Sequence, residues 1–337
     1  MTASTYITVN PSLIMPGVLM QYGQKTGAFN ILQSRAPEIK LGSEDKMVYV
    51  RQLSMRSDAQ VSQVNGTVLP GVGFTTSMVG TPTYLVKARS VFDRHSTADA
   101  ANWGYNLPNA QQLGLRQAIY QQMRNALLYG VGAGEGLLNT ANATNTNLPA
   151  DSLGHTTILT YDNGEMSTFI LKTISQILTN TFMLGQPFRV AILLPQRVLA
   201  KWAYYGVIQL SSFQREGAGS NSIAGTVKSI AGWSSGEIEF CIDETLIGKG
   251  AGGTDAIIFT VPELNTPDTG GLIDTNTFAS LQPSILATSL MLADKSAPTE
   301  IYSPLPDGAT DLVQELRITS GFCVRPEALT ILSAAYQ

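Results

Sequence analysis

The segment between Asn109 and Gly130 has the hydrophobic pattern of an amphipathic helix. Its apolar residues fall on two neighbouring stripes, Leu115, Ile119, Met123 and Ala126 on one and Leu113, Tyr120 and Leu127 on the other. Most of the polar positions between them are uncharged, including Gln121 and Gln122. Asn109 is a good N-cap and Gly130 a good residue after the last turn, so we expect the helix between them. Its glutamine-rich face suits packing against other copies better than chemistry.

A second amphipathic helix is expected after Asp162, with Gly185 as its end. Its apolar positions recur with helical spacing: Met166, Phe169, Ile170, Ile174, Ile177 and Leu178. The run Phe188–Leu194 then reads as a buried strand, and Pro195 opens a further helix through Val198, Leu199 and Trp202. Together with expected strands at Glu237–Ile242 and Ala256–Thr260, this predicts a separate sheet with flanking helices.

Residues 46–92 show the shorter period of β structure. Lys46–Leu53 and Tyr84–Phe92 are the expected strands, and Asn65-Gly66 between them is a strong signal for a tight hairpin turn. A long two-stranded projection buries too little apolar surface to be stable alone. It therefore either folds back as an edge of the core sheet or lies on a neighbouring subunit.

Residues 1–45 are interrupted by proline and glycine, yet they are too apolar for a disordered tail. The apolar positions include Tyr6, Ile7, Leu13 and Leu19. Such an arm is stabilised either by lying across another surface or by packing on the chain's own core, and the sequence leaves both alternatives open.

A glycine-rich turn follows the first helix, with Gly132, Gly134 and Gly136 leading into Leu137-Leu138-Asn139. This helix and turn, and the closing segment Ile318–Ala328 with its Pro326, resemble the major capsid proteins of tailed double-stranded-DNA bacteriophages, the Hong Kong phage fold. The order of the predicted elements agrees with that family over nearly the whole chain.

The resemblance implies an α+β Hong Kong phage-like fold, with domains in the order that the following ranges give. They are an N-terminal arm (1–45), an extended β-hairpin loop (46–92), a peripheral domain with the long spine helix (93–186), an axial domain with a central sheet (187–261), and a return to the axial and peripheral domains with closing strands (262–337).

The resemblance further implies a major capsid protein that self-assembles, as pentamers and hexamers, into the head shell around the phage genome. The implied partners are scaffolding, portal and cement proteins, with the packaged DNA contacted non-specifically; the implied location is the virion, assembled in the host bacterial cytoplasm. Residues expected at subunit interfaces are Tyr6, Ile7, Leu13, Leu19, Asn65, Gly66, Gln121 and Gln122. An encapsulin-type compartment, which has the same fold, is the alternative among assemblies.

Composition agrees with a surface that neighbours cover. Only 14% of residues are charged, below the usual quarter, and the net charge is -4. No stretch has the clustered Lys and Arg of a dedicated nucleic-acid-binding protein. A neutral secreted enzyme would have a similar composition. However, the N-terminus lacks the basic and apolar regions of a signal peptide, no segment has the length of a membrane span, and Cys241 and Cys323 lie in apolar runs that indicate buried thiols. We therefore expect a soluble protein without a membrane partner.

Candidate chemistry is weak. Gly232–Gly236 matches the G-x-S-x-G elbow of a serine hydrolase around Ser234, which is the alternative from another functional class. That motif requires a following helix and a downstream histidine, whereas His95 and His155 both lie upstream. Neither Gly130–Gly136 nor Gly248–Thr254 has the context or spacing of a nucleotide-binding loop, and the isolated group Asp93, His95 and Asp99 does not have a recognisable metal-site spacing. No catalytic residue, cofactor or metal is predicted.

Overall fold

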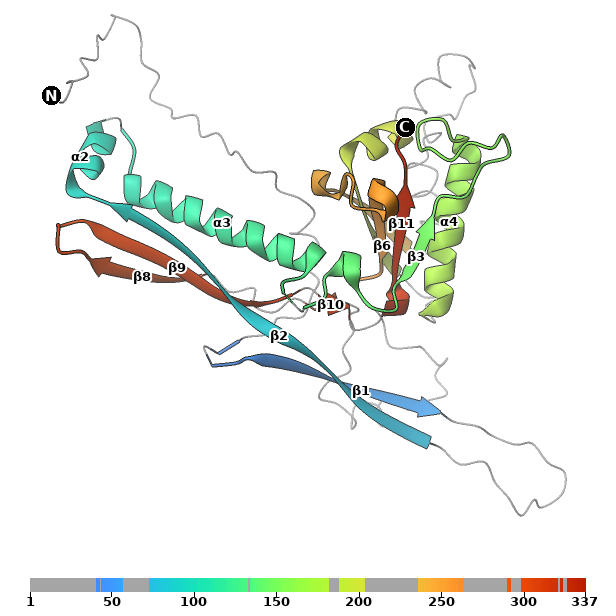
Figure 1. Ribbon diagram of the computed structural model, residues 1–337, viewed down its shortest axis with the longest axis horizontal. Helices are drawn as coiled ribbons and strands as arrows, with labels where there is room; N and C mark the ends of the chain where they lie inside the picture. Colours follow the sequence, from blue (N-terminus) through green and yellow to red (C-terminus); the bar gives the residue numbers. More distant parts are fainter. Residues whose placement is uncertain are drawn as a thin grey trace, which may run out of the picture. The chain divides into compact units, whose positions relative to one another are not determined.

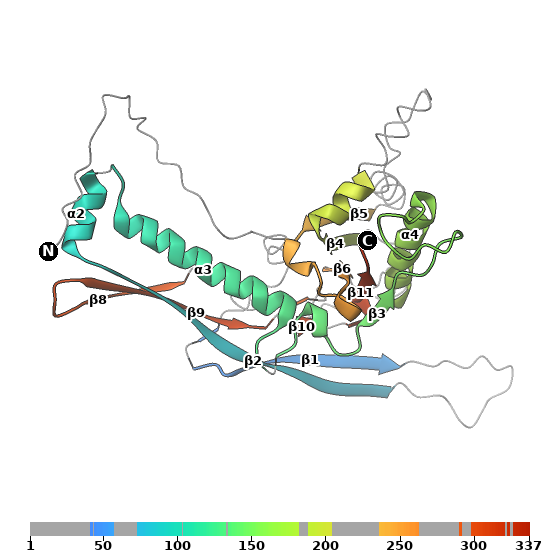
Figure 2. The same cartoon turned by 45° about the horizontal axis from the view of Figure 1, so that its top comes forward.

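The structure of the chain is a computed structural model (Figures 1 and 2). It describes residues 41–42, 44–56, 73–102, 104–132, 134–181, 188–203, 236–262, 290–291, 298–320, 322–323 and 326–337. The predicted arm residues Tyr6, Ile7, Leu13 and Leu19 and the turn Asn65-Gly66 lie outside these ranges.

The elements follow one another in an α+β order. The strands are β1 (Met47–Arg56), β2 (Gly73–Phe92), β3 (Thr144–Asn147), β4 (Phe188–Leu194), β5 (Gly236–Ile242), β6 (Asp255–Thr260), β7 (Leu290–Met291), β8 (Thr299–Pro304), β9 (Thr310–Thr319), β10 (Phe322–Cys323) and β11 (Leu329–Ala334). The helices are α2 (Arg94–Asn102), α3 (Leu107–Tyr129) and α4 (Asn163–Asn180), a helical stretch at 196–203, and the short 3-10 helices η1 (Leu137–Asn139), η3 (Glu244–Leu246), η4 (Ala251–Gly253) and η5 (Pro326–Ala328).

The described residues divide into two compact units. Among the described residues, the first unit contains Lys87–Ile119 and Pro298–Glu315, and the second contains those within Thr26–Val86, Tyr120–Ala297 and Leu316–Gln337. Three long elements, β2, α3 and β9, each continue from one unit into the other. The predicted domain ranges remain a prediction.

The second unit is built around a five-stranded sheet with the order β3-β11-β6-β4-β5. β4 is parallel to β5, whereas β6 is antiparallel to both β4 and β11. The three strands predicted from the sequence are present, and β3 and β11 extend the sheet beyond the predicted segment. All residues of β6 are buried, as expected of a central strand that is covered on both faces.

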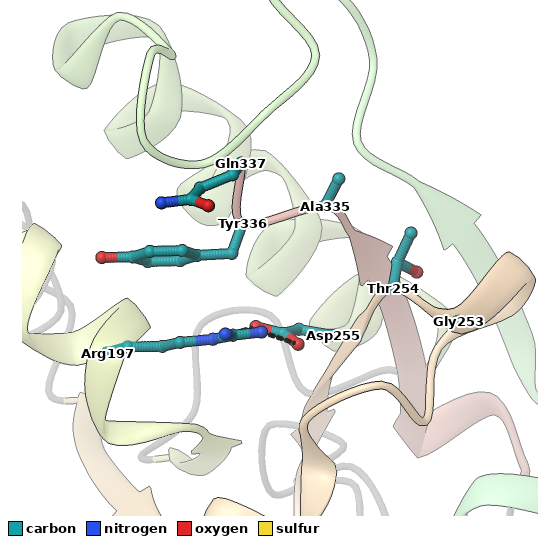
Figure 3. A pocket seen from close by; sticks show the side chains of 7 residues that line it. All are labelled: Arg197, Gly253, Thr254, Asp255, Ala335, Tyr336 and Gln337. Carbon is teal, nitrogen blue, oxygen red and sulfur yellow. Dashed lines mark hydrogen bonds and ion pairs between the residues drawn. The ribbon is translucent and has the colours of Figure 1, made fainter.

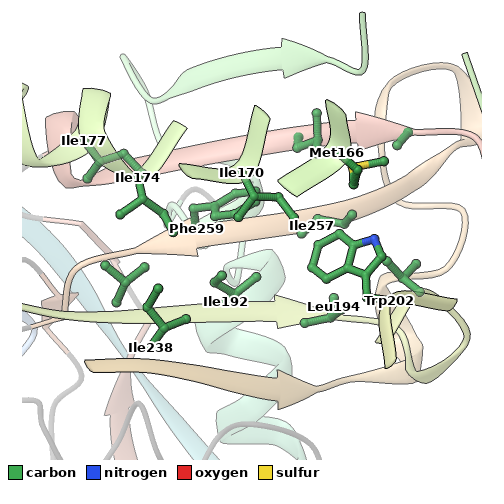
Figure 4. Packing of buried hydrophobic residues seen from close by; sticks show 14 of the residues in the cluster. Met166, Ile170, Ile174, Ile177, Ile192, Leu194, Trp202, Ile238, Ile257 and Phe259 are labelled. Atoms are coloured by element: carbon green, nitrogen blue, oxygen red, sulfur yellow. The ribbon is translucent and has the colours of Figure 1, made fainter. Parts of the chain in front are cut away.

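The main hydrophobic core lies between this sheet and α4 (Figure 4). Asp162 caps α4, since its carboxylate accepts a hydrogen bond from the N–H of Glu165 at 3.0 Å. The predicted face of α4 supplies Met166, Ile170, Ile174 and Ile177, and the sheet supplies Ile192, Ile257 and Phe259. Trp202, from the predicted helix after Pro195, is fully buried in the same core. The predicted end of α4 was wrong: the helix ends at Asn180 with Thr181 as C-cap, before Gly185.

The long helix α3 has the predicted core stripe, because Leu115, Ile119, Met123 and Ala126 are all buried. On the second stripe Leu127 is buried, but Leu113 and Tyr120 are exposed. The predicted N-cap was wrong. The helix begins at Leu107, and the side chain of Asn106 accepts a hydrogen bond from the N–H of Asn109. Both asparagines suit a cap, and Pro108 fits the first turn of the earlier start.

In the first unit, the β8–β9 hairpin runs alongside the N-terminal half of α3 (Figures 1 and 2). Glu300 on β8 joins them, since its carboxylate accepts hydrogen bonds from Gln112 at 2.8 Å, Arg116 at 2.9 Å and Gln314 at 3.0 Å. Two ion pairs, Lys87–Glu315 and Arg89–Asp311, connect β2 to β9. The basic groups in this unit's sheet are therefore neutralised within the chain.

The glycine-rich turn after α3 brings backbone segments into direct contact. Gly130 has φ +73°, which ends the helix as predicted. A Cβ on Gly136 would lie 2.3 Å from the N of Gly130, and one on Gly134 would lie 2.3 Å from Oγ of Ser320. These positions accept only glycine because a neighbouring backbone or buried side chain fills the space of a side chain.

Gly136→Ala is therefore expected to destabilise the fold by at least about 1–3 kcal/mol, since the clashing atoms are backbone atoms that cannot move aside. Gly114→Ala is the matched control. Gly114 is exposed within α3, and a Cβ there meets nothing within 4 Å, so the change should stabilise by about 0.5–1 kcal/mol. Urea unfolding of both variants measures the two effects. Equal stability of Gly136→Ala and wild type would contradict the contact described for the turn.

Candidate assembly surfaces

The residues considered for enzyme chemistry do not form a reactive group in the described structure. Ser234 lies outside the described residues, and the chain from Gly236 onwards is strand β5, where the hydrolase elbow requires a helix. Asp93 caps α2, and hydrogen bonds from the side chain and N–H of Ser96 lower its pKa; His95 and Asp99 are exposed on α2. Within the described ranges, no three His, Cys, Asp or Glu side chains are placed to hold a metal ion.

A helix able to span a membrane is absent from the part of the chain that the structure describes. Cys241 is buried in β5, as predicted. Cys323 lies in the short strand β10.

A small pocket lies beside the C-terminal residues of the second unit, and an internal ion pair forms its floor (Figure 3). The guanidinium of Arg197 donates from Nε to the carboxylate of Asp255 at 2.8 Å, and it lies 4.7 Å from the centre of the Tyr336 ring. Figure 3 shows this ring parallel to the guanidinium, with Gln337 on its other side. Because Asp255 neutralises Arg197, this ion pair stabilises the packing of Tyr336 and does not provide a free positive charge for an anion.

The loop before α4 is fixed by one buried carboxylate, that of Asp151. It accepts hydrogen bonds from the N–H of His155 at 2.7 Å, Leu153 at 3.0 Å and Asp162 at 3.1 Å, and it lies 3.0 Å from Nδ1 of His155. Burial by itself would raise the pKa of this carboxyl. The hydrogen bonds from His155, Asp162 and Leu153 outweigh it, so the pKa lies below its ordinary value of 3.8.

The most unusual surface of the second unit is the two-stranded ribbon of β1 and β2 (Figure 1). Met47–Arg56 pairs antiparallel with Gly73–Pro82 in an unbroken register. Residues directly opposite one another share a face, which places Met47, Tyr49, Arg51, Met78, Gly80 and Pro82 on one face of the ribbon. We call this set the ribbon face. The fraction exposed is 42% for Met47, 62% for Tyr49 and 64% for Met78.

Gly80 gives this face its local shape. It pairs with Tyr49, and a Cβ at Gly80 would lie 2.8 Å from Cε1 of the Tyr49 ring. The ring therefore lies across the glycine, where it covers the backbone of the neighbouring strand. Apart from Arg51, which pairs with Met78, this face is apolar, and the ribbon is too thin to bury it internally.

The structure also gives the surroundings of the other residues predicted at interfaces. Gln122 is exposed on α3, whereas Gln121 is half-buried and has an interaction partner. The ribbon face was not predicted from the sequence. The alternation of Met47 and Tyr49 in the sequence indicates one face of a strand. Which residues of β2 lie opposite them follows only from the strand register.

No protein-family model and no curated protein matches the chain. Solved structures do match it along nearly its whole length. A chain from the capsid of Myoviridae phage XM1 covers 98% of this chain and 99% of its own length, with a TM-score of 0.66 and 10% identity. The capsid of the empty GTA particle (97% and 95%, TM-score 0.56, 12% identity) and that of cyanophage P-SCSP1u (97% and 94%, TM-score 0.56, 12% identity) are also similar.

These similarities define the class of fold. The chain has the fold of tailed-phage capsid proteins. More specifically, it has the Hong Kong phage-like α+β fold expected from the spine helix and its glycine-rich turn, and that prediction is confirmed.

The Asp151 carboxylate gives a prediction for the pH dependence of stability. Its pKa is lower in the folded than in the unfolded chain, so its contribution is fully present above about pH 4 and is lost as the pH falls through the lowered pKa. Asp151→Asn should lower the melting temperature at pH 7 and lose less stability than wild type between pH 5 and pH 2. Asp99→Asn on the exposed side of α2 is the control. Parallel melting curves for wild type and Asp151→Asn across this range would contradict the role of Asp151.

Proposed function

We propose that this chain is the major capsid protein of a tailed phage and self-assembles into the head shell that encloses the double-stranded DNA genome. The observation that carries the proposal is the match to capsid chains over 94–99% of their own length, with no large part of either chain left over. The similar structures named above are capsids of phages and of a GTA particle, which favours this function over an encapsulin-type compartment.

The exposed ribbon face supports an assembly role. It presents Met47, Tyr49 and Met78 to solvent on a projection that has little apolar surface of its own to cover them. Exposed apolar patches of this kind mark interaction sites on soluble proteins. We infer that the ribbon face lies on a neighbouring subunit, which is the second of the two arrangements that the sequence leaves open for this hairpin.

The further parts of the proposal follow from a shell of this type. The copies form pentamers and hexamers, the arm residues Tyr6, Ile7, Leu13 and Leu19 and the tip Asn65-Gly66 contact neighbours, and scaffolding, portal and cement proteins are further partners. The packaged DNA is contacted non-specifically, in keeping with the net charge of -4. The protein is a virion component that assembles in the host cytoplasm and has no catalytic role.

Negative-stain microscopy of the purified chain tests the proposal directly. Closed or tubular shells built from rings are the expected result, alone or with a co-expressed scaffolding protein. A monomer that assembles under neither condition, and that hydrolyses esters through Ser234, would show that the function is enzymatic.

Met78→Lys is expected to reduce the yield of shells at least tenfold while leaving the melting temperature within about 2 °C of wild type. Met78 is exposed, so a charge there costs little in folding, but burial of that charge in every subunit contact is unfavourable. Thr75→Lys is the matched control, because Thr75 is exposed on the same strand and lies on the opposite face. Sedimentation measures the shell yield. Equal losses for both variants, or none, would contradict the assignment of the ribbon face.

A further inference from the structure

β8 lies at the edge of the four-stranded sheet, whose order is β1-β2-β9-β8. Its inner side pairs with β9 from Thr299↔Glu315 to Pro304↔Thr310. Among the described residues, no strand pairs with its outer side. An open edge offers unpaired N–H and C=O groups to any extended chain that reaches it.

The register shows which groups face outward. Beyond the strand, the N–H of Leu305 donates to the C=O of Ala309, so this pair is of the hydrogen-bonded kind. Hydrogen-bonded and non-bonded pairs alternate along an antiparallel ladder. Thr299, Ile301 and Ser303 therefore bond to β9, and the backbone groups of Glu300 and Tyr302 point away from the sheet.

Two prolines limit this open edge. Pro298 and Pro304 occupy the next outward positions on either side, and neither has an N–H to donate. The outward donors at these positions are thus confined to Glu300 and Tyr302. A partner strand at this edge is correspondingly short.

The edge is also neutral and partly apolar. The only charged side chain of β8 is Glu300, and Gln112, Arg116 and Gln314 bind its carboxylate within the chain. Ile301 is 42% exposed and Tyr302 is 50% exposed. Of the features that protect edge strands from self-pairing, β8 is short and bounded by prolines, but it has no free charge.

We propose that β8 pairs antiparallel with β8 of a second copy across a two-fold axis at Ile301. In this register, Glu300 of each copy is opposite Tyr302 of the other, and both residues donate and accept a backbone hydrogen bond. Two copies suit the edge because it has no uncompensated charge to repel an identical strand, and a symmetric contact uses the same patch twice. This contact is small, so it strengthens association by adding to other contacts between the same two copies.

Cysteine crosslinking tests both the partner and the register. In the proposed pairing, the two copies of Ile301 form a non-bonded pair with Cα atoms about 4.5 Å apart, which is within disulfide range. Ile301→Cys should therefore give a disulfide-linked dimer after mild oxidation. Val313→Cys is the matched control: Val313 is opposite Ile301 on β9, one strand further from the axis on each side. Its two copies would be about 14 Å apart, too far to link.

The experiment uses the full chain, both unassembled and in sedimented particles. Wild type is the control for any disulfide that the native Cys241 and Cys323 form. A dimer band for Ile301→Cys alone supports the proposal. A dimer for both variants, or for neither, overturns it.

Ile301→Lys and Val313→Lys provide a second test that does not depend on oxidation. With unchanged melting temperatures, Ile301→Lys should weaken the association of copies at least tenfold by light scattering, because two lysines then meet at the axis. Val313→Lys should change it less than twofold. Shells that form normally with Ile301→Lys would overturn this pairing and leave the proposed capsid function standing, whereas failure of wild type to assemble would contradict the capsid function instead.

Discussion

The burial of both faces of the five-stranded sheet is the interaction on which the rest of the chain depends. Val190, Ile192 and Phe259 face the α4 side, while Leu193, Ile258 and Ile331 alternate with them, and all six are buried. Thin elements such as the β1–β2 ribbon bury too little apolar surface to fold alone. Such elements therefore depend on the core to which they are covalently joined.

The contrast between a buried core and a thin ribbon separates the interactions that stabilise the fold from those available for contacts between copies. The described ion pairs Lys87–Glu315, Arg89–Asp311 and Arg116–Glu300 are all internal to one unit. Exposed apolar residues, by contrast, occur on several elements, including the ribbon face and β8. We therefore propose that contacts between copies rest mainly on apolar burial and neutral hydrogen bonds, which salt does not screen as it screens surface ion pairs.

Elements with a strong, local hydrophobic pattern could be predicted from the sequence. The first apolar stripe of α3, the apolar face of α4, the strands β4 and β6, and the resemblance carried by Gly132, Gly134 and Gly136 were correctly predicted. Elements with a weak or ambiguous pattern were missed or misplaced. The strand β3 reads Thr-Asn-Thr-Asn and has no hydrophobic period, so only its pairing with β11 reveals it. The cap of α3 was misplaced because Asn106 and Asn109 are chemically equivalent as caps.

The surfaces were harder to predict than the core for a physical reason. Which side chains share the ribbon face depends on which residues are opposite Met47 and Tyr49, and which backbone groups of β8 are free depends on whether Glu300 or Ile301 bonds to β9. A shift of one residue would reverse both answers. Register is set by the whole sheet and its turns, including the bond between Leu305 and Ala309. The chain's own core thus fixes the chemistry that it presents to other copies.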